Sequence, residues 1–375
     1  MNNVLKILER EGVLHGMTTY EIMHGENLIA TITLQGQCRI LVPSFMPWNL
    51  YLEETDELDG RVNNVTNFYY WCATRVLTLD RKYAKQILSS MGMSQATTDK
   101  ERAQIALSYH CLTLTDIYWV RTADESVSFA QINLYENHLE NAFVDVSLRG
   151  RQMTVGNVHL LADDASTSGC FPKAWIREKD GFYLLKDGDE CAVQNELLAS
   201  RICQCFRCNQ IVYEPYEYDG LRVTRSRLMT GMEYSIVSRE AFEIYAVNHD
   251  IDSMEYILNL DAYSFYMMNI LDYLVGNTDR HWGNWGFLVD NKTGHALRLH
   301  DLMDFNQSFR EYDTPEGAGC QTINNRKISQ REAALEAVQK VGLNQIAEVK
   351  EEWFEDRKAD FLMFRQRLQQ LINKS

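Results

Sequence analysis

The sequence predicts an α+β protein with strand-rich segments at residues 17–52 and 171–229 and a mainly helical last third. Residues 17–52 alternate between apolar and polar side chains, with the two-residue period of a half-buried strand. Residues 171–229 contain strand-like runs around one helix, and residues 262–275 form a long apolar helical run. At roughly 100–200 residues per domain, this length predicts two domains or three small ones. We expect an accessory α/β region at 1–150, a small strand-rich lobe at 151–230 and a mainly helical lobe at 231–375.

The charge balance limits the partners of the protein. The chain holds 37 Lys and Arg against 52 Asp and Glu, so its formal net charge is −15. A surface built for nucleic acid is cationic, and an anionic membrane attracts the same kind of surface. We therefore expect neither direct nucleic-acid binding nor a membrane partner.

The location of the protein is predicted from its first residues and its cysteines. Lys6, Glu9, Arg10 and Glu11 interrupt the apolar residues at the start, so no export signal is expected. No run approaches the roughly 18 apolar residues that a membrane span requires. The nine cysteines are odd in number and scattered, as in proteins whose thiols stay reduced. We expect a cytoplasmic protein.

The sequence of the accessory region predicts a small sheet followed by helices. Its strands fall within residues 17–52. Asn67–Leu88 and Lys100–His110 space their apolar residues as helices do. Residues 113–160 mix aromatic and polar side chains and predict no regular element.

The middle of the chain predicts strands around one helix. Asp219-Gly220 favours a tight hairpin between two strands. Asp187-Gly188-Asp189 marks a turn between a strand and a helix. The expected elements are strands at Phe171–Arg177, Gly181–Lys186, Ile211–Tyr218 and Leu221–Met229, and a helix at Ala192–Phe206.

The last third predicts helices around one short strand. Asp261 has the side chain of an N-cap for a helix over Ala262–Val275, and Gly276 suits the left-handed residue that ends a helix. A strand is expected at Phe287–Asp290. Two or three amphipathic helices follow from about Ser329.

A polar loop after the apolar helix carries the strongest chemical pattern. It reads Gly276-Asn277-Thr278-Asp279-Arg280-His281-Trp282-Gly283-Asn284-Trp285-Gly286, and a second acidic element after the next hairpin contains Asp304. These residue types suit phosphoryl transfer. Asp279 would accept the proton of a substrate hydroxyl, and Asn284 and Asp304 would bind Mg²⁺ through oxygen. The alternative interpretation is a polar loop closed by a hairpin.

Two upstream residues favour the phosphoryl-transfer interpretation. Lys186 ends an apolar strand, and Glu196 follows ten residues later in the next predicted helix. A strand lysine paired with a helix glutamate holds the phosphates of ATP in kinase folds. Each residue also has a plain interpretation, as a strand-end lysine or as an acid near a helix N-terminus. The order of all five is harder to obtain by accident: Lys186, Glu196, Asp279, Asn284, Asp304.

A loop of small residues precedes the lysine strand. It reads Ser166-Thr167-Ser168-Gly169-Cys170-Phe171-Pro172-Lys173. Small residues let backbone N–H groups approach a phosphate closely. The loop lacks both a Gly-Lys-Ser/Thr ending and three spaced glycines, so alone it is a weak sign of nucleotide binding.

The chain resembles the HipA-like kinases, the family of bacterial toxin–antitoxin serine/threonine kinases, over about residues 155–375. The most specific part is Asn277–Asn284, where the family reads Asn-Thr-Asp-x-His-x-x-Asn. This core is also similar to the catalytic loop of phosphoinositide 3-kinases. Ser168-Gly169 with Pro172-Lys173 resembles the family's Ser-Gly-x-x-Pro-Lys phosphate loop. The resemblance implies a bilobal kinase-like fold with ATP and Mg²⁺ as cofactors.

The resemblance also implies roles for individual residues. Asp279 corresponds to the catalytic aspartate, and His281 would shape the loop or neutralise phosphate. The family has Pro-Leu-aromatic-Asp after the hairpin where this chain has Asp301-Leu302-Met303-Asp304, so Asp304 is the favoured second metal ligand and Asp301 the alternative. The remaining roles are a magnesium ligand for Asn284, phosphate binding for Lys186 with Glu196 as its partner, phosphate-loop contacts for Ser168 and Gly169, and an adenine contact near Met229.

The predicted activity is ATP- and Mg²⁺-dependent phosphorylation of a Ser or Thr hydroxyl in a protein substrate. Ser166, Thr167 and Ser168 are candidate autophosphorylation sites, as the family implies. The family also implies a separate antitoxin-like regulator. Two alternatives remain open on the same fold: a small-molecule phosphotransferase and an inactive nucleotide-binding interaction module.

Overall fold

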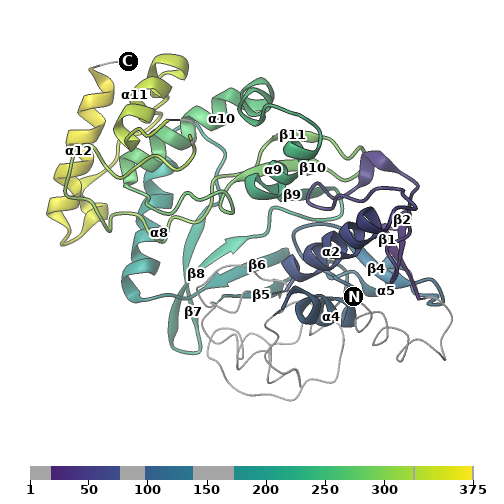
Figure 1. The fold of residues 1–375 in the computed structure, drawn as a ribbon. Coiled ribbons are helices and arrows are strands. Elements are labelled where there is room, and N and C mark those ends of the chain that lie inside the picture. The colour runs from purple at the N-terminus through teal and green to yellow at the C-terminus, as the bar shows by residue number, and fades with distance from the viewer. Residues whose placement is uncertain (1–17, 77–97, 138–172, 324–325, 374–375) are drawn as a thin grey trace.

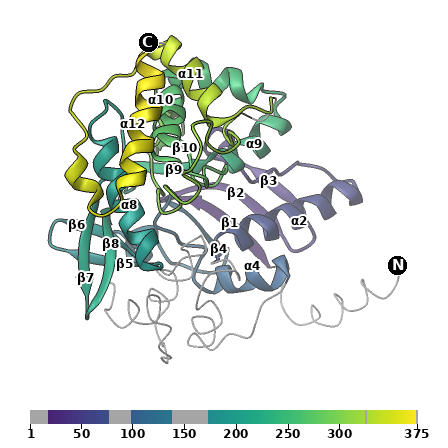
Figure 2. The same ribbon diagram turned by 90° about the vertical axis from the view of Figure 1, so that its left-hand side faces the viewer.

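Three antiparallel sheets and a group of C-terminal helices make up the described part of the chain (Figure 1). The structure is a computed structural model that describes residues 18–76, 98–137, 173–323 and 326–373. The mixed α/β composition agrees with the fold class that the sequence predicts. Figure 2 shows helices α10, α11 and α12 above, with the β5–β8 sheet and the β1–β4 sheet on opposite sides below them.

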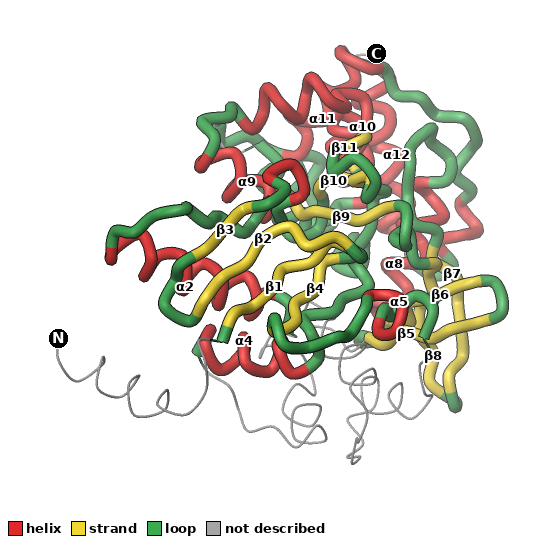
Figure 3. The backbone as a smooth tube through the Cα atoms, turned by 90° about the vertical axis from the view of Figure 1, so that its right-hand side faces the viewer, coloured by secondary structure: helices red, strands yellow, loops and turns green. Residues whose placement is uncertain are grey.

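The first sheet belongs to the N-terminal region, and its strands lie in the order β3-β2-β1-β4. Helices α2 and α4 lie side by side under this sheet (Figure 3) and share one buried core with it. Trp71 of α2 and Trp119 of β4 are among the largest side chains in that core. The elements are β1 (Thr19–His24), β2 (Asn27–Thr33), β3 (Cys38–Ile40), η1 (Pro43–Phe45), α2 (Leu58–Thr74), α4 (Asp99–Ser108), β4 (Tyr118–Thr122) and α5 (Phe129–Ile132).

The strand-rich start of the accessory region is confirmed, whereas the predicted helix at Asn67–Leu88 has a different beginning. Helix α2 starts at Leu58, nine residues earlier. Its first turns are polar, contain Gly60 and leave Val62 exposed, so they show no apolar period. Residues 77–97 lie outside the described ranges. The shorter helix is confirmed as α4, and Thr98 and Glu101 form a capping box at its start.

The second sheet has the strand order β5-β6-β8-β7 and confirms the predicted strands of the middle segment. Asp219 and Gly220, with φ of 47° and 74°, join β7 to β8 in a left-handed turn. Helix α8 begins two residues before its predicted start, because Asp189 accepts a hydrogen bond from Ala192 N as its N-cap. The elements are β5 (Lys173–Glu178), β6 (Gly181–Lys186), α8 (Glu190–Cys203), β7 (Tyr213–Tyr218) and β8 (Leu221–Arg227).

The third sheet, in the order β11-β10-β9, lies among the C-terminal helices. Helix α10 is the centre of the second core, and every residue from Met267 to Val275 is buried. None of the helices in the described ranges is both long and apolar enough to cross a bilayer. The elements are β9 (Tyr234–Ser238), α9 (Arg239–Asn248), α10 (Ser253–Val275), β10 (Gly286–Asp290), β11 (Ala296–Leu299), α11 (Gln330–Val341), η2 (Glu351–Phe354) and α12 (Lys358–Ile372).

Helix α10 contains both helix signals that the sequence predicts. Asp261 interrupts the helix with non-helical backbone angles, and its Oδ1 accepts a hydrogen bond from Ser264 N at 3.0 Å. Asp261 therefore caps the apolar half, while a preceding half starts at Ser253. Gly276 ends the helix in the left-handed conformation, with φ of 61°. This stop directs the following polar loop away from the helix axis.

The N-terminal region contacts the connection between β8 and β9. Leu228 packs against the N-terminal core, and its neighbour Met229 packs against the C-terminal core. Thr230 donates a hydrogen bond from Oγ1 to the carbonyl of Leu114. In the following strand, β9, the backbone N–H of Ile236 donates to the carbonyl of Thr115 at 2.9 Å. The segment before β4 therefore holds the connection between the second and third sheets and the strand β9 that follows it.

Candidate active site

Lys186 brings together two carboxylates from distant parts of the chain. It is the last residue of β6, and its Nζ lies 2.8 Å from Glu196 Oε1 in α8 and 2.7 Å from Asp304 Oδ1 beyond β11. The Lys186 and Glu196 side chains are buried, and Asp304 is 22% exposed. The structure thus joins three residues that the sequence analysis selected separately.

Two residues that the sequence analysis missed hold these carboxylates in place. Thr224 of β8 donates from Oγ1 to Glu196 Oε2 at 2.7 Å, so both oxygens of Glu196 are used. The hydroxyl of Tyr213 in β7 accepts the backbone N–H of Asp304 at 3.1 Å. Asp304 has φ of 62°, a left-handed conformation that is uncommon outside glycine. The sheet therefore fixes both acids around the lysine.

The charges in this cluster stabilise one another. Burial alone would lower the pKa of Lys186, but the Asp304 and Glu196 carboxylates raise it well above its usual value. Burial would raise the pKa of Asp304, yet Lys186 and then Lys173 lower it to about 2. Lys173 lies directly opposite Lys186 in the β5–β6 register. The cluster consequently holds a charged lysine and an ionised aspartate at neutral pH.

The polar loop Asn277–Asn284, which we call the catalytic loop, presents a half-exposed carboxylate on Asp279. Burial raises the pKa of Asp279, an increase that His281 opposes and Asp304 reinforces. The Nδ1 of His281 accepts the backbone N–H of Gly283 at 3.0 Å, which assigns the ring proton to Nε2. That Nε2 lies 4.0 Å from Asp279 Oδ1. His281 thus holds the loop backbone at Gly283 and lies near Asp279.

The buried guanidinium of Arg280 binds the catalytic loop to two neighbouring segments. Arg280 Nε and Nη2 donate to the two carboxylate oxygens of Asp272 in α10, at 2.9 Å and 3.0 Å. Its Nη1 donates to the carbonyls of Asn284 and Met303, at 3.0 Å and 2.5 Å. One side chain therefore connects the apolar helix, the catalytic loop and the segment that presents Asp304. The sequence signal for this network was Asp272, a lone acid within an apolar helical run.

Asn277 connects the same parts through its side chain. Its Nδ2 donates to Asp272 Oδ1 at 3.1 Å and to the carbonyl of Asp304 at 3.4 Å. Its Oδ1 accepts the backbone N–H of Asp279 at 3.2 Å. The side chain is buried, so these bonds are shielded from water. Asn277 therefore positions the base of the loop relative to Asp304.

The donor set of the loop fits magnesium bound together with phosphate oxygens. Asn284 donates from Nδ2 to the carbonyl of Asp279 at 2.8 Å, and this orientation leaves its Oδ1 as an oxygen donor. Asp304 contributes an ionised carboxylate. Within the described ranges, no three His, Cys, Asp or Glu side chains gather in a cluster able to hold a metal. An amide oxygen and an ionised carboxylate are ligands of the kind that Mg²⁺ takes together with water and substrate phosphates.

The other residues selected from the sequence lie outside this cluster. Asp301 binds Arg298, with Nη1 and Oδ1 2.7 Å apart, so its carboxylate is already paired. Met229 lies in the β8–β9 connection, partly buried against the C-terminal core. Ser168 and Gly169, together with the possible autophosphorylation sites at 166–168, lie outside the described residues.

The segment before α11, described at residues 317–323 and 326–329, contacts the catalytic loop through Gln321. Gln321 donates to the carbonyl of Thr278 at 2.8 Å, and Gln330, at the start of α11, donates to the carbonyl of Asn277 at 2.6 Å. The sequence analysis missed both contacts. An open hollow of about 630 Å³ is lined by this segment, including Arg326 and Lys327. The segment that lines the hollow therefore contacts Thr278, the residue before Asp279.

The fold is similar to that of HipA from Shewanella oneidensis, in a structure of HipA with HipB and operator DNA. The likeness has a TM-score of 0.51 at 10% sequence identity and covers 95% of this chain and 91% of that one. The proinflammatory kinase CtkA of Helicobacter pylori aligns with 54% of this chain and 88% of its own, at a TM-score of 0.43 and 16% identity. No family model matches the sequence. No curated protein matches it at a significant level. The likeness to HipA establishes a shared overall fold.

Proposed function

We propose that the protein is an ATP- and Mg²⁺-dependent kinase of the HipA-like type that phosphorylates a Ser or Thr hydroxyl of a protein. The carrying observation is the bridge from Lys186 to both Glu196 and Asp304, beside a loop that presents Asp279 and Asn284. A lysine held by a helix glutamate next to a metal-binding aspartate is the arrangement that phosphoryl transfer from ATP requires. In this proposal the β5–β8 sheet with α8 is the small lobe, and the C-terminal helices form the large one.

The residues of the chain divide the chemistry among them. Lys186 binds the nucleotide phosphates, and Glu196 and Thr224 keep its ammonium group aimed at them. Asp279 orients the substrate hydroxyl and accepts its proton, and its raised pKa makes it a stronger base than an exposed aspartate. Asn284 and Asp304 hold Mg²⁺, which neutralises phosphate charge when it is bound. Met229 contacts the adenine from the β8–β9 connection.

The choice of a protein substrate rests on the fold and on the surface beside the catalytic loop. The hollow of about 630 Å³ beside residues 317–323 and 326–329 is open, and Gln321 of that segment contacts the loop that carries Asp279. The similar HipA structure contains HipB and operator DNA. By analogy we propose a separate antitoxin-like regulator for this chain, and with a net charge of −15 any DNA contact would be made by that regulator.

The central test replaces the proposed base. Asp279→Asn keeps the size of the side chain and removes its basicity, so phosphotransfer should fall by about 10²–10⁴-fold. Transfer is measured with labelled ATP against cell extract, a peptide array and a metabolite panel, which separate a protein substrate from a small molecule. Nucleotide binding, measured by calorimetry with Mg²⁺, should survive.

The matched control is Asp250→Asn, which makes the same change at an exposed turn residue. It should transfer phosphate as the wild type does. Equal activity in Asp279→Asn would refute the proposed mechanism. Nucleotide binding without turnover in the wild type would instead support an inactive nucleotide-binding module.

A further inference from the structure

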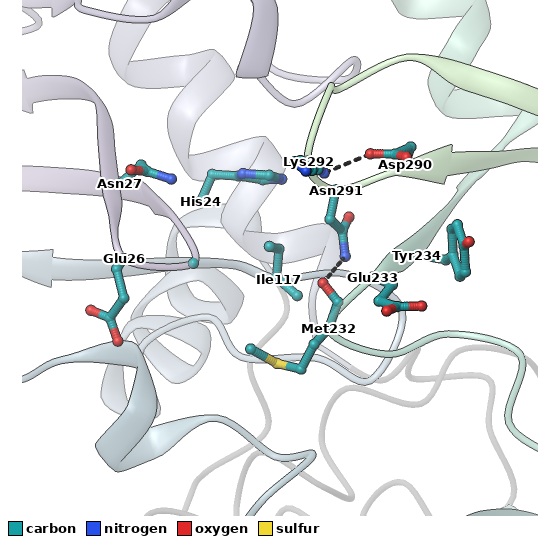
Figure 4. Close-up of a pocket in the computed structure, with 11 residues that line it drawn as sticks. His24, Glu26, Asn27, Ile117, Met232, Glu233, Tyr234, Asp290, Asn291 and Lys292 are labelled. Atoms are coloured by element: carbon teal, nitrogen blue, oxygen red, sulfur yellow. Dashed lines mark hydrogen bonds between the residues drawn. The ribbon is translucent and has the colours of Figure 1, made fainter.

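A second cavity, of about 430 Å³, lies between the N-terminal sheet and the third sheet. The β1–β2 turn forms one wall, and the start of β9 and the β10–β11 turn form the other (Figure 4). None of the residues that build the candidate active site lines it. Its walls are His24, Gly25, Glu26, Asn27, Ile117, Met232, Glu233, Tyr234, Asp290, Asn291 and Lys292.

His24 is a buried polar side chain without a hydrogen-bond partner among the residues that the structure describes. It is only 3% exposed, and its ring packs on Phe45 and Tyr118 with centroids 4.7 Å and 4.9 Å away. Neither ring nitrogen forms a hydrogen bond with a described residue, although buried polar groups nearly always have one. In Figure 4 the ring points across the cavity toward Asn291 and Lys292. The open hydrogen-bonding position therefore faces the cavity.

The other polar groups of the wall are held in place by the protein itself. Glu26 Oε1 accepts from Ala130 N at 2.7 Å. Asp290 Oδ1 accepts from the backbone N–H of Lys292 at 2.7 Å. The Nδ2 of Asn291 donates to the carbonyls of Gly231 and Met232, at 3.1 Å and 3.2 Å. The cavity is thus preorganised, which lowers the cost of binding a ligand.

The charge of the wall selects the ligand. Three carboxylates, on Glu26, Glu233 and Asp290, face one cation, Lys292, so the lining carries a charge of 1 − 3 = −2. Burial lowers the pKa of His24 to about 4, so its imidazole is neutral at pH 7. A neutral imidazole has one nitrogen that accepts a hydrogen bond. A cationic ligand can donate a hydrogen bond to that nitrogen and is attracted by the carboxylates of the lining. An anion is repelled by the same carboxylates.

We propose that this cavity binds a small organic cation, an alkylammonium or guanidinium group. The ligand donates a hydrogen bond to His24, pairs with Glu233 and Glu26 at the rim, and lays its apolar carbons on Ile117 and Met232. The cation can be a free small molecule or an Arg or Lys side chain of a protein segment, since both present the same chemistry.

The test measures binding by calorimetry on the full chain, independently of any phosphotransfer. The probes are agmatine as the free cation, an acetyl-Gly-Arg-Gly-amide peptide as the side-chain form, and inorganic phosphate as the anion. Glu233→Gln removes one rim charge from an exposed residue and should weaken agmatine binding about three- to tenfold. Glu217→Gln, an exposed change of the same charge on β7, should leave it unchanged. His24→Leu removes the acceptor and should weaken it about tenfold or more.

The outcomes separate clearly. Tighter binding of agmatine than of the peptide assigns the cavity to a free metabolite, and the reverse order assigns it to a protein segment. Either result supports the proposal if Glu233→Gln weakens binding and Glu217→Gln does not. Because Glu233 is exposed, the test does not depend on whether His24→Leu folds. Preferential binding of phosphate, or agmatine binding that is equal in wild type and Glu233→Gln, overturns it.

Discussion

Asp301 and Asp304 lie three residues apart but have different surroundings. The Asp301 carboxylate is bound by Arg298 on the same hairpin, outside the lysine cluster. The Asp304 carboxylate reaches Lys186 and is fixed by the Tyr213 hydroxyl at its backbone. At the scale of single residues, the neighbouring side chains therefore distinguish the two aspartates. The sequence alone could only favour Asp304 over Asp301 as the candidate metal ligand.

The first prediction uses this difference. In the proposed kinase, Asp304→Asn should lower phosphotransfer by about 10²-fold or more, because it removes the negative charge that pairs with Lys186 and is proposed to hold Mg²⁺. Asp301→Asn should change it by less than about threefold, because it disrupts only a partly exposed ion pair. Initial rates at saturating and limiting Mg²⁺ measure both. A larger loss in Asp301→Asn than in Asp304→Asn would assign the metal to the other aspartate.

Candidate site residues could be selected from the sequence where a polar residue stands at a distinctive position in a strand, helix or loop. The contacts that support them could not be predicted. Lys186, Glu196 and Asp279 follow from strand, helix and loop positions along the chain. Thr224 and Tyr213 did not, because a threonine or tyrosine in a strand looks the same whether or not it faces a carboxylate. Their roles depend on pairing between strands that lie far apart in sequence from Asp304.

At the scale of elements, the end of α10 determines where the catalytic loop begins. Gly276 has φ of 61°, and a Cβ built there would lie 2.4 Å from Cδ2 of the buried Tyr312. Gly220 has a similar φ of 74°, but a Cβ there would have no atom within 4 Å. The two glycines thus share a left-handed backbone conformation, which would strain any other residue, and differ in their steric surroundings.

The second prediction compares these two positions. Gly220→Ala should cost about 1 kcal/mol of unfolding free energy, from the left-handed conformation alone. Gly276→Ala should cost about 1–3 kcal/mol more, because the new methyl group must displace a buried ring. Urea denaturation of both variants measures the difference. Equal losses would show that Tyr312 moves aside freely.

Element positions were predictable where turn chemistry agreed with periodicity. The strand Gly181–Lys186 was placed correctly at both ends, because Gly181 and the following Asp-Gly-Asp turn bound an apolar run. The start of α2 was missed, because its polar first turns carry no apolar stripe and its contacts are with a distant strand pair. For example, the backbone N–H of Glu53 donates to Oδ1 of Asn64 in α2, and no local sequence pattern predicts this contact.

At the scale of the whole molecule, two buried histidines tie stability to pH. Burial lowers the pKa of His24 to about 4 and that of His300 to about 4. An unfolded histidine titrates near 6.5, so between about pH 6.5 and pH 4 the unfolded chain binds protons that the folded chain does not. Stability is therefore lost as pH falls through this window and is fully present above it.

The third prediction measures that slope. Each histidine should contribute a loss of about 2 kcal/mol in unfolding free energy between pH 7 and pH 5. His300→Asn keeps a donor for the Asp301 carbonyl and cannot titrate, so its loss over this range should be smaller by about that amount. His249→Asn, at an exposed position, is the control and should keep the wild-type slope. An unchanged slope in His300→Asn would mean that His300 titrates normally in the folded protein.

The contacts of Leu114 and Thr115 with the β8–β9 connection and β9 also constrain how the molecule moves. Rotation of the β5–β8 sheet relative to the C-terminal helices has to bend this connection, which makes it a hinge. Leu114 and Thr115 hold the hinge through hydrogen bonds to Thr230 and Ile236, so rotation must carry the N-terminal region along or break those bonds. The N-terminal region thereby sets the stiffness of the hinge. If the protein is the kinase proposed above, substitutions in the N-terminal region should change the rates at which nucleotide enters and leaves without altering any residue of the candidate site.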